Sequence, residues 1–188
     1  MDAYHVSVAA EAFAAAVFAQ AGYDVSVQYG ANQPEYDLVV SRGPRFARIS
    51  VKGSQNGSWP LATRFYRAKG GYQKAITSWL ESHGSPVLYC LVQFRGVPVG
   101  QCPRIYIATP EELASQLRKA RSGIGGTVLW EDHRFIRGVA AGPISQVPKA
   151  WSFCPERLKT LLNAGAQQVA APDASRVPRP ARRTDRRR

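Results

Sequence analysis

The sequence predicts an α/β domain whose elements follow the order α-β-β-β-α-β between residues 5 and 94. Three observations predict this order. Residues 5–21 are rich in alanine, the strongest helix former. Residues 36–54 have the pattern of two strands around a Gly-Pro turn. Residues 86–94 form a nearly continuous apolar run of strand length, which is typical of a central strand buried on both faces.

The first helix is apolar nearly all round, so we expect it to be buried. Its predicted apolar stripe comprises Val8, Ala12, Ala15 and Ala19. The helix carries one carboxylate, Glu11. A buried acid is costly unless it is paired or bound to a cation, which makes Glu11 a candidate functional residue. An alternating segment at residues 23–29 predicts the first strand.

The hairpin pairs residues 36–40 with residues 46–52 around the turn at Gly43-Pro44. If the turn is centred there, the numbers of facing residues sum to roughly 87 to 89. Asp37 then lies opposite the end of the second strand that holds Ser50 and Lys52. Because residues two apart in a strand share a face, Arg48, Ser50 and Lys52 point one way. Their neighbours Ala47, Ile49 and Val51 point into a core.

Residues 53–62 are expected to form a polar loop with an exposed Trp59. In residues 64–74, basic side chains alternate with Phe65, Tyr66 and Tyr72. Such a mixture suits a nucleic-acid backbone, through phosphate pairing and stacking on bases. The alternative is a solvated loop whose aromatic residues anchor it to the core.

The remaining chain predicts further helices and strands, followed by a tail. A helix is expected at residues 72–80, strands at 104–108 and 127–130, and helices at 109–120 and 156–162. Thr109, Pro110 and Glu112 form the signature of a capping box at the start of a helix. We therefore expect a domain at residues 1–164, with its core at 5–110 and a C-terminal extension at 111–164. Residues 165–188 are expected to be a disordered basic tail.

The chain has 188 residues and a formal net charge of +12. Residues 172–188 hold seven Arg and two Asp, so +5 belongs to this segment and +7 to residues 1–171. A basic body indicates a polyanionic partner. Three cysteines without C-x-x-C spacing, of which Cys90 is a predicted core residue, favour a reducing compartment. No apolar stretch is long enough to cross a bilayer, and no basic signal segment is present, so we expect the cytoplasm and no membrane partner.

The order of elements, with Glu11 on the helix, Asp37 in YDLVV and Lys52 in VKGS, resembles the PD-(D/E)XK nuclease superfamily. Small resolvase-like and uncharacterised bacterial members are the most similar. The resemblance covers about residues 5–110. It implies a restriction-endonuclease-like fold, in which a central mixed sheet is flanked by helices and followed here by extra C-terminal elements.

The resemblance also implies metal-dependent hydrolysis of phosphodiester bonds in DNA, with Mg²⁺ or Mn²⁺ as cofactor. Asp37 and Glu11 would be metal ligands, the Val51 carbonyl a third, and Lys52 would act on the attacking water and the phosphate charge. A divalent ion neutralises the phosphate and lowers the pKa of bound water. The residues expected to contact backbone phosphates are Arg64, Arg67, Lys69 and Lys74.

Ser50 departs from the superfamily pattern, because the triplet reads Ser50-Val51-Lys52 where an acid is expected at the first position. A hydroxyl is a weaker Mg²⁺ ligand than a carboxylate. Either Glu35 takes up the missing charge, or metal affinity is low, or the site is inactive. Gln55 is a further polar candidate.

Alternatives to a nuclease follow from the same residues. One is a catalytically weak or inactive nucleic-acid-binding module on the same fold. Another is a basic adaptor that binds an acidic protein through the Arg-rich tail. Asp37 and Lys52 could also form an ordinary cross-strand salt bridge. His133 is expected in a turn. The sequence leaves open whether the substrate is duplex DNA, a junction, a flap or RNA, and whether the protein forms a homodimer, as many members of this superfamily do.

Overall fold

A computed structural model of the protein describes residues 1–28, 36–134 and 144–169. Its helices are α1 (Ala3–Gln20), α2 (Gly71–Glu81), α3 (Pro110–Lys119) and α4 (Pro155–Val169). Its strands are β1 (Asp24–Val27), β2 (Leu38–Arg42), β3 (Arg45–Ser54), β4 (Ser58–Trp59), β5 (Leu88–Gln93), β6 (Arg104–Ala108), β7 (Leu129–Trp130), β8 (Asp132–Arg134) and β9 (Ile144–Gln146). Short 3₁₀ turns occupy Thr63–Phe65, Arg121–Gly123 and Lys149–Trp151.

The five long strands form one mixed sheet in the order β1-β2-β3-β5-β6. Only the β3–β5 pair is parallel among these neighbours, and the others are antiparallel. A parallel pair needs a crossover connection, which the chain makes through β4 and α2. The predicted α/β class, with a central mixed sheet flanked by helices and further elements after it, is confirmed.

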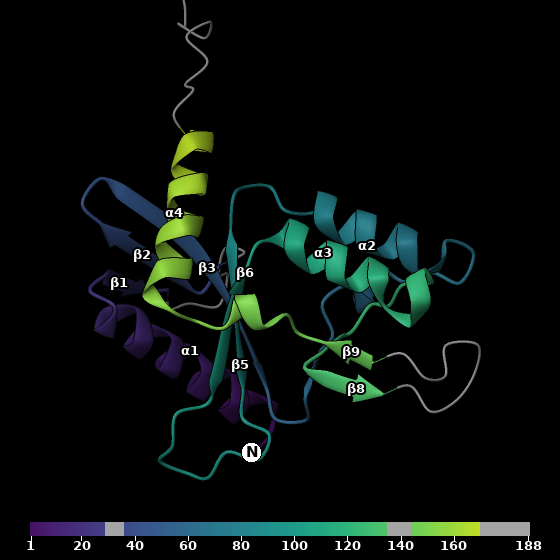
Figure 1. The fold of residues 1–188 in the computed structure, drawn as a ribbon, viewed down its shortest axis with the longest axis horizontal. Helices are drawn as coiled ribbons and strands as arrows, with labels where there is room; N and C mark the ends of the chain where they lie inside the picture. Colours follow the sequence, from purple (N-terminus) through teal and green to yellow (C-terminus); the bar gives the residue numbers. More distant parts are fainter. Residues whose placement is uncertain (29–35, 135–143, 170–188) are drawn as a thin grey trace, which may run out of the picture.

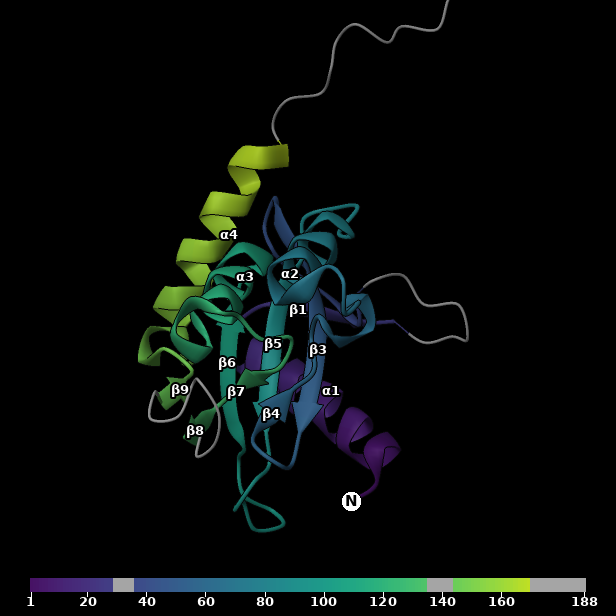
Figure 2. The ribbon, with the colours of Figure 1, turned by 90° about the vertical axis from the view of Figure 1, so that its right-hand side faces the viewer.

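Each face of the sheet has its own hydrophobic core. Figure 1 shows α1 and α4 on one side of the sheet and α2 and α3 on the other. The α1–α4 core contains Ile49 and Val51 from β3. The α2–α3 core contains Tyr89 and Leu91 from β5 together with Trp59. Figure 2 views the molecule from the α2 side. In this view α2 and α3 lie over the upper part of the strands, and β4 and β7 lie below the two helices, over the lower part.

The buried stripe of α1 differs from the expected one. Its buried residues are Val6, Ala10, Ala14 and Phe18, whereas Val8 is 49% exposed. The reason is that α1 lacks a polar face, so its own sequence does not determine which side meets the sheet. The choice is made by the fit against β3.

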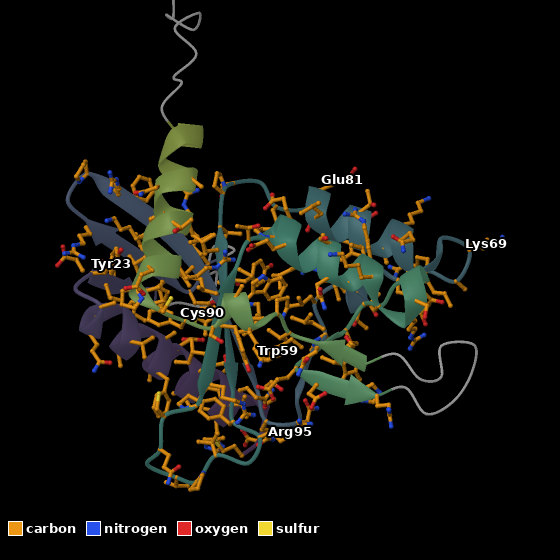
Figure 3. All side chains as sticks on the ribbon, in the orientation of Figure 1. Tyr23, Trp59, Lys69, Glu81, Cys90 and Arg95 are labelled. Atoms are coloured by element: carbon orange, nitrogen blue, oxygen red, sulfur yellow. The ribbon has the colours of Figure 1, made fainter. Side chains whose placement is uncertain are left out.

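Trp59 is also placed differently from the prediction, because it is only 1% exposed. The segment expected to be a loop continues β3 as far as Ser54 and then forms β4, which pairs with β7. This pairing turns the indole inward, and its Nε1 donates a hydrogen bond to the Lys52 carbonyl at 2.8 Å. Figure 3 shows Trp59 in the interior, beside the sheet.

The C-terminal elements confirm some expectations and correct others. Thr109 and Glu112 form the predicted capping box of α3. Helix α4 continues to Val169, past the expected end at Leu162, so residues 165–169 are helical and do not belong to a disordered tail as predicted. Residues 170–188, the rest of the predicted tail, lie outside the described residues. His133 is in strand β8, not in a turn, and its ring stacks on Trp130 with centroids 4.2 Å apart. Among the described residues, no helix is long and apolar enough to span a membrane.

Candidate functional site

The predicted register of the hairpin is confirmed. Leu38 faces Ile49 and Arg42 faces Arg45, so facing residue numbers sum to 87. Asp37 stands one position before β2 and therefore opposite Ser50. Its backbone N–H donates to the Ile49 carbonyl at 2.8 Å, which extends the ladder by one residue. The strand pairing thus fixes the backbone of Asp37 against the triplet on β3.

The Asp37 side chain is held in place as well. Its Oδ2 accepts a hydrogen bond of 2.6 Å from the Val51 N–H. The other carboxylate oxygen, Oδ1, has no hydrogen-bond partner in the part of the chain that the structure describes. Asp37 is half-buried. A carboxylate that is oriented by the backbone and keeps one oxygen available is suited to bind a cation.

Ser50 and Val51 are both buried, on opposite faces of β3. Ile49 is fully buried and Val51 is 6% exposed, which confirms that they point into a core, and the half-buried Ala47 packs against the same core. Ser50 is only 2% exposed, although it shares a face with Lys52. Strand β3 is therefore covered on both sides at the position that faces Asp37.

Lys52 follows on the Ser50 face, and it is exposed. Its carbonyl is fixed by Trp59, whereas its ammonium forms no ion pair with any described residue. The alternative of an ordinary Asp37–Lys52 salt bridge therefore does not apply among these residues. The amine remains available to an anionic ligand beside the carboxylate.

Glu11 approaches this end of β3 on helix α1. A Cβ on Gly53 would lie 2.8 Å from the Val6 carbonyl oxygen and 2.9 Å from the Ala10 Cβ. Helix α1 therefore crosses β3 at the residue after Lys52, and Glu11 directly follows the contact residue Ala10. Glu11 is half-buried and accepts a hydrogen bond of 3.2 Å from the Ser7 hydroxyl.

No group of three or more His, Cys, Asp or Glu side chains that could hold a metal occurs among the described residues. The predicted donors are two carboxylates, those of Asp37 and Glu11, with backbone and water oxygens to complete a shell, but the two carboxylates share no contact among the described residues. Mg²⁺ accepts such a shell, because it prefers oxygen ligands and retains several waters. The residue types suit a hard divalent cation, and a metal bound by Asp37 and Glu11 together stays a prediction.

The remaining predicted candidates differ in what the structure says of them. Glu35 lies outside the described residues. Gln55 is exposed, and its amide donates to the Met1 carbonyl at 2.5 Å, so it ties the chain start to the loop after β3. The Val51 N–H serves Asp37, and a ligand role for its carbonyl stays a prediction.

The four cations expected to contact phosphate are all exposed and lie on the segment from η1 (Thr63–Phe65) to α2. The Arg64 guanidinium lies 4.8 Å from the Phe65 ring centroid. Arg67 donates to the carbonyls of Arg64 and Tyr66. Figure 3 places Lys69 at the outer end of the α2 side, far from Trp59.

A long stretch without acidic residues follows Asp37 in the sequence. Between Asp37 and Glu81 the sequence contains no Asp or Glu. The same stretch contains eight cations, namely Arg42, Arg45, Arg48, Lys52, Arg64, Arg67, Lys69 and Lys74. Arg48 shares the face of Ser50 and Lys52, and its guanidinium lies 5.5 Å from the Tyr36 ring centroid. The segment that follows Asp37 is thus strongly basic, which favours an anionic partner.

Sequence reasoning did not identify the buried carboxylate of Glu131, which pairs with Arg104. Glu131, 7% exposed, accepts hydrogen bonds from Arg104 at 2.7 and 2.9 Å and from the Tyr106 hydroxyl at 2.8 Å. Burial by itself raises the pKa of Glu131, but the bonds from Arg104 and Tyr106 outweigh it and the net pKa is lowered. Burial and the bond to Glu131 raise the pKa of Tyr106 to about 12. No local pattern around Glu131 signals these partners, which come from β6.

Comparison with known proteins gives a weak structural likeness. No protein-family model matches the chain. No curated protein matches it either. Among solved structures, the chain is similar to a bacterial homing endonuclease, with a TM-score of 0.47 and 15% sequence identity over 89% of this chain and 96% of that one. A likeness at this level carries no functional argument.

Proposed function

We propose that the protein is a metal-dependent endonuclease that hydrolyses phosphodiester bonds in DNA. One observation carries the proposal: the Asp37 carboxylate is fixed by the Val51 N–H, one strand away from Lys52, and these two side chains do not neutralise each other. Their arrangement supports a site for a cation and for the phosphate that the cation binds. The order of elements and the positions of Glu11, Asp37 and Lys52, which resemble the PD-(D/E)XK superfamily, support the same function.

Asp37 and Glu11 would hold the divalent ion, Mg²⁺ or Mn²⁺. When bound, such an ion neutralises phosphate charge and makes a bound water more acidic. Asp37 keeps its orientation through the Val51 N–H. Lys52 places a positive charge beside the reacting phosphate, where it stabilises the charge that develops in the transition state. The exposed cations from Arg64 to Lys74 would hold the flanking phosphates.

The test is plasmid nicking by the full chain with Mg²⁺ or Mn²⁺. Asp37→Asn keeps an acceptor for the Val51 N–H but removes the negative charge, so cleavage should fall by about two orders of magnitude or more. Lys52→Ala should also lower the rate, by about tenfold to a hundredfold. Asp132→Asn and Lys159→Ala are controls that remove an exposed charge elsewhere. Metal-dependent cleavage at the unmodified rate in both site variants would refute the proposal.

A second candidate, a nucleic-acid-binding module without hydrolysis, is favoured by Ser50. Ser50 is 2% exposed, and its hydroxyl is neutral. Ser50 therefore adds no negative charge to a cation site at Asp37. In this case, DNA binding would depend strongly on salt while no nicking appears with either metal. Replacing Ser50 with Asp would then be the informative variant, since an added carboxylate beside Asp37 should permit metal-dependent nicking.

A further inference from the structure

A stacked aromatic pair lies on the basic surface of α2. Tyr66, from the loop before α2, and Tyr72, from its first turn, stack with ring centroids 4.9 Å apart and an interplanar angle of 29°. Tyr66 is 38% exposed, so its ring is accessible from solvent. Phe65, by contrast, is half-buried and packs against the α2–α3 core. The loop thus uses Phe65 as its anchor, and Tyr66 is not needed for that purpose.

Arg121 joins this pair from a distant part of the sequence. Its guanidinium lies 5.0 Å from the Tyr72 ring centroid, and its Nη1 donates to the Tyr72 hydroxyl at 2.9 Å. Arg121 and Ser122 both adopt left-handed backbone conformations, with φ of 53° and 55°. For residues other than glycine this conformation is unfavourable, so it persists only where the surrounding structure imposes it.

The Gln73 side chain holds that turn against α2. Its amide nitrogen donates to the carbonyls of Gly123 and Ile124, at 3.0 and 3.3 Å. Gly125 passes close by, since a Cβ there would lie 3.0 Å from the Gln73 Nε2 and 3.1 Å from the Tyr72 Cβ. The result is a rigid assembly of two rings and a guanidinium, built from two segments about 50 residues apart.

The surroundings of this assembly are cationic. Arg67, Lys69 and Lys74 are exposed on the same segment, and Arg118 and Lys119 end α3 beside the turn. Stacked aromatic rings with an ordered guanidinium and adjacent cations are the elements of a single-strand binding surface: bases stack on the rings and phosphates pair with the cations. A duplex cannot use the rings, because its bases are already stacked on each other.

We propose that Tyr66, Tyr72 and Arg121 form a stacking platform for an unpaired base, and that the protein therefore prefers DNA with a single-stranded segment over blunt duplex. This proposal rests on the proposed function in one respect, the nucleic-acid ligand. It does not depend on hydrolysis at Asp37. The platform uses none of the residues proposed for cleavage.

The test measures binding of labelled oligonucleotides in EDTA by fluorescence anisotropy. Three probes are used: a single strand, a blunt duplex, and the same duplex with a three-nucleotide bulge that contains 2-aminopurine. Tyr66→Leu keeps apolar bulk and removes the ring. It should weaken binding of the single strand and the bulged duplex about 5- to 100-fold, the value of one stacked base, and leave blunt-duplex binding within about twofold. The quenching of 2-aminopurine that the unmodified protein causes should be lost.

Tyr4→Leu is the matched control, since Tyr4 is a 73% exposed tyrosine on α1. It should change neither binding nor quenching. Equal weakening for all three probes in Tyr66→Leu would show a phosphate-contacting surface only and would overturn the platform. Unchanged single-strand binding would also overturn it. If the unmodified protein nicks DNA but Tyr66→Leu gives either of these two binding results, the platform is wrong and the proposed function stands. If Tyr66→Leu weakens only the binding of the single strand and the bulged duplex, and the unmodified protein does not nick DNA, the platform stands and the proposed function is wrong.

Discussion

At the scale of single residues, the candidate site depends on how a few polar groups are paired. One carboxylate oxygen of Asp37 accepts a hydrogen bond from the Val51 N–H, and the Lys52 carbonyl accepts one from the Trp59 indole. The β3 backbone thus orients the Asp37 side chain, and Trp59 fixes the backbone of Lys52. Cys90 shows the opposite situation: it is fully buried, and burial raises the pKa of its thiol to about 12, so it is a core residue without reactivity, as expected.

Replacing Trp59 with Phe should loosen the Lys52 end of β3. The change leaves the Lys52 carbonyl without its 2.8 Å donor, at a cost of about 1–3 kcal/mol, and should lower the nicking rate severalfold. Trp79→Phe is the control, because Trp79 is 3% exposed in the same core but contacts His83 and Tyr89 instead. Urea denaturation should show both variants destabilised, and only Trp59→Phe should nick more slowly while folded. Equal rates in the two variants would contradict a positioning role.

Glu131→Gln should make the free energy of unfolding depend less on pH in the acidic range. The folded pKa of Glu131 is lowered, so the carboxylate contributes its full stability above the unfolded value, about 4.3, and loses it as the pH falls toward the folded pKa. We expect the free energy of unfolding of Glu131→Gln to be about 2 kcal/mol lower than that of the unmodified protein at neutral pH, and this difference to be smaller near pH 3.5. Urea denaturation at the two pH values measures it. Glu81→Gln, at an exposed residue, should show no such difference.

At the scale of elements, the contact between α1 and β3 places the helix that carries Glu11 against the residue that follows Lys52. The helix passes so close to Gly53 that no side chain fits there. A second link joins α3 to α4: the Arg157 guanidinium donates to Glu112 at 2.5 and 2.7 Å, and Glu112 also completes the α3 capping box. Helices on opposite faces of the sheet are thus connected around its β6 edge.

Gly53→Ala should therefore push α1 away from β3. The added methyl group meets backbone and Cβ atoms at 2.8 and 2.9 Å, which should cost about 1–3 kcal/mol. Because Glu11 moves with α1, nicking should fall more than stability alone explains. Gly84→Ala is the matched control, since a Cβ there meets nothing within 4 Å. Thermal melting and nicking of both variants test this, and a Gly53→Ala protein that matches Gly84→Ala in both would contradict the close approach.

At the scale of the whole molecule, charge is distributed in a way that suits a polyanion. The acid-free stretch supplies eight cations to the body, and residues 172–188 add a net +5. Each phosphate neutralised releases counterions, so affinity for DNA should fall steeply with salt. The tail and the body are expected to contribute independently to that slope.

Removing residues 172–188 separates the nuclease from the adaptor interpretation. If the body binds DNA, truncation should weaken the affinity severalfold, reduce the slope of log affinity against log salt, and leave nicking at saturating DNA unchanged. Anisotropy titrations at three salt concentrations measure this. Complete loss of DNA binding, with retained folding by circular dichroism, would instead favour the adaptor, in which the Arg-rich tail is the binding element.

The sequence by itself determined the elements, because local signals are strong in this chain. Alanine content predicted α1, the Gly-Pro turn predicted the register that places Asp37 opposite Ser50, and the capping box predicted the start of α3. What only the tertiary structure decided depends on contacts between distant residues. The buried side of α1, the inward turn of Trp59, the partners of Glu131 and the approach of Arg121 to Tyr72 are of this kind. Each results from packing of one element against another, and a local pattern carries no information about which partner an element will meet.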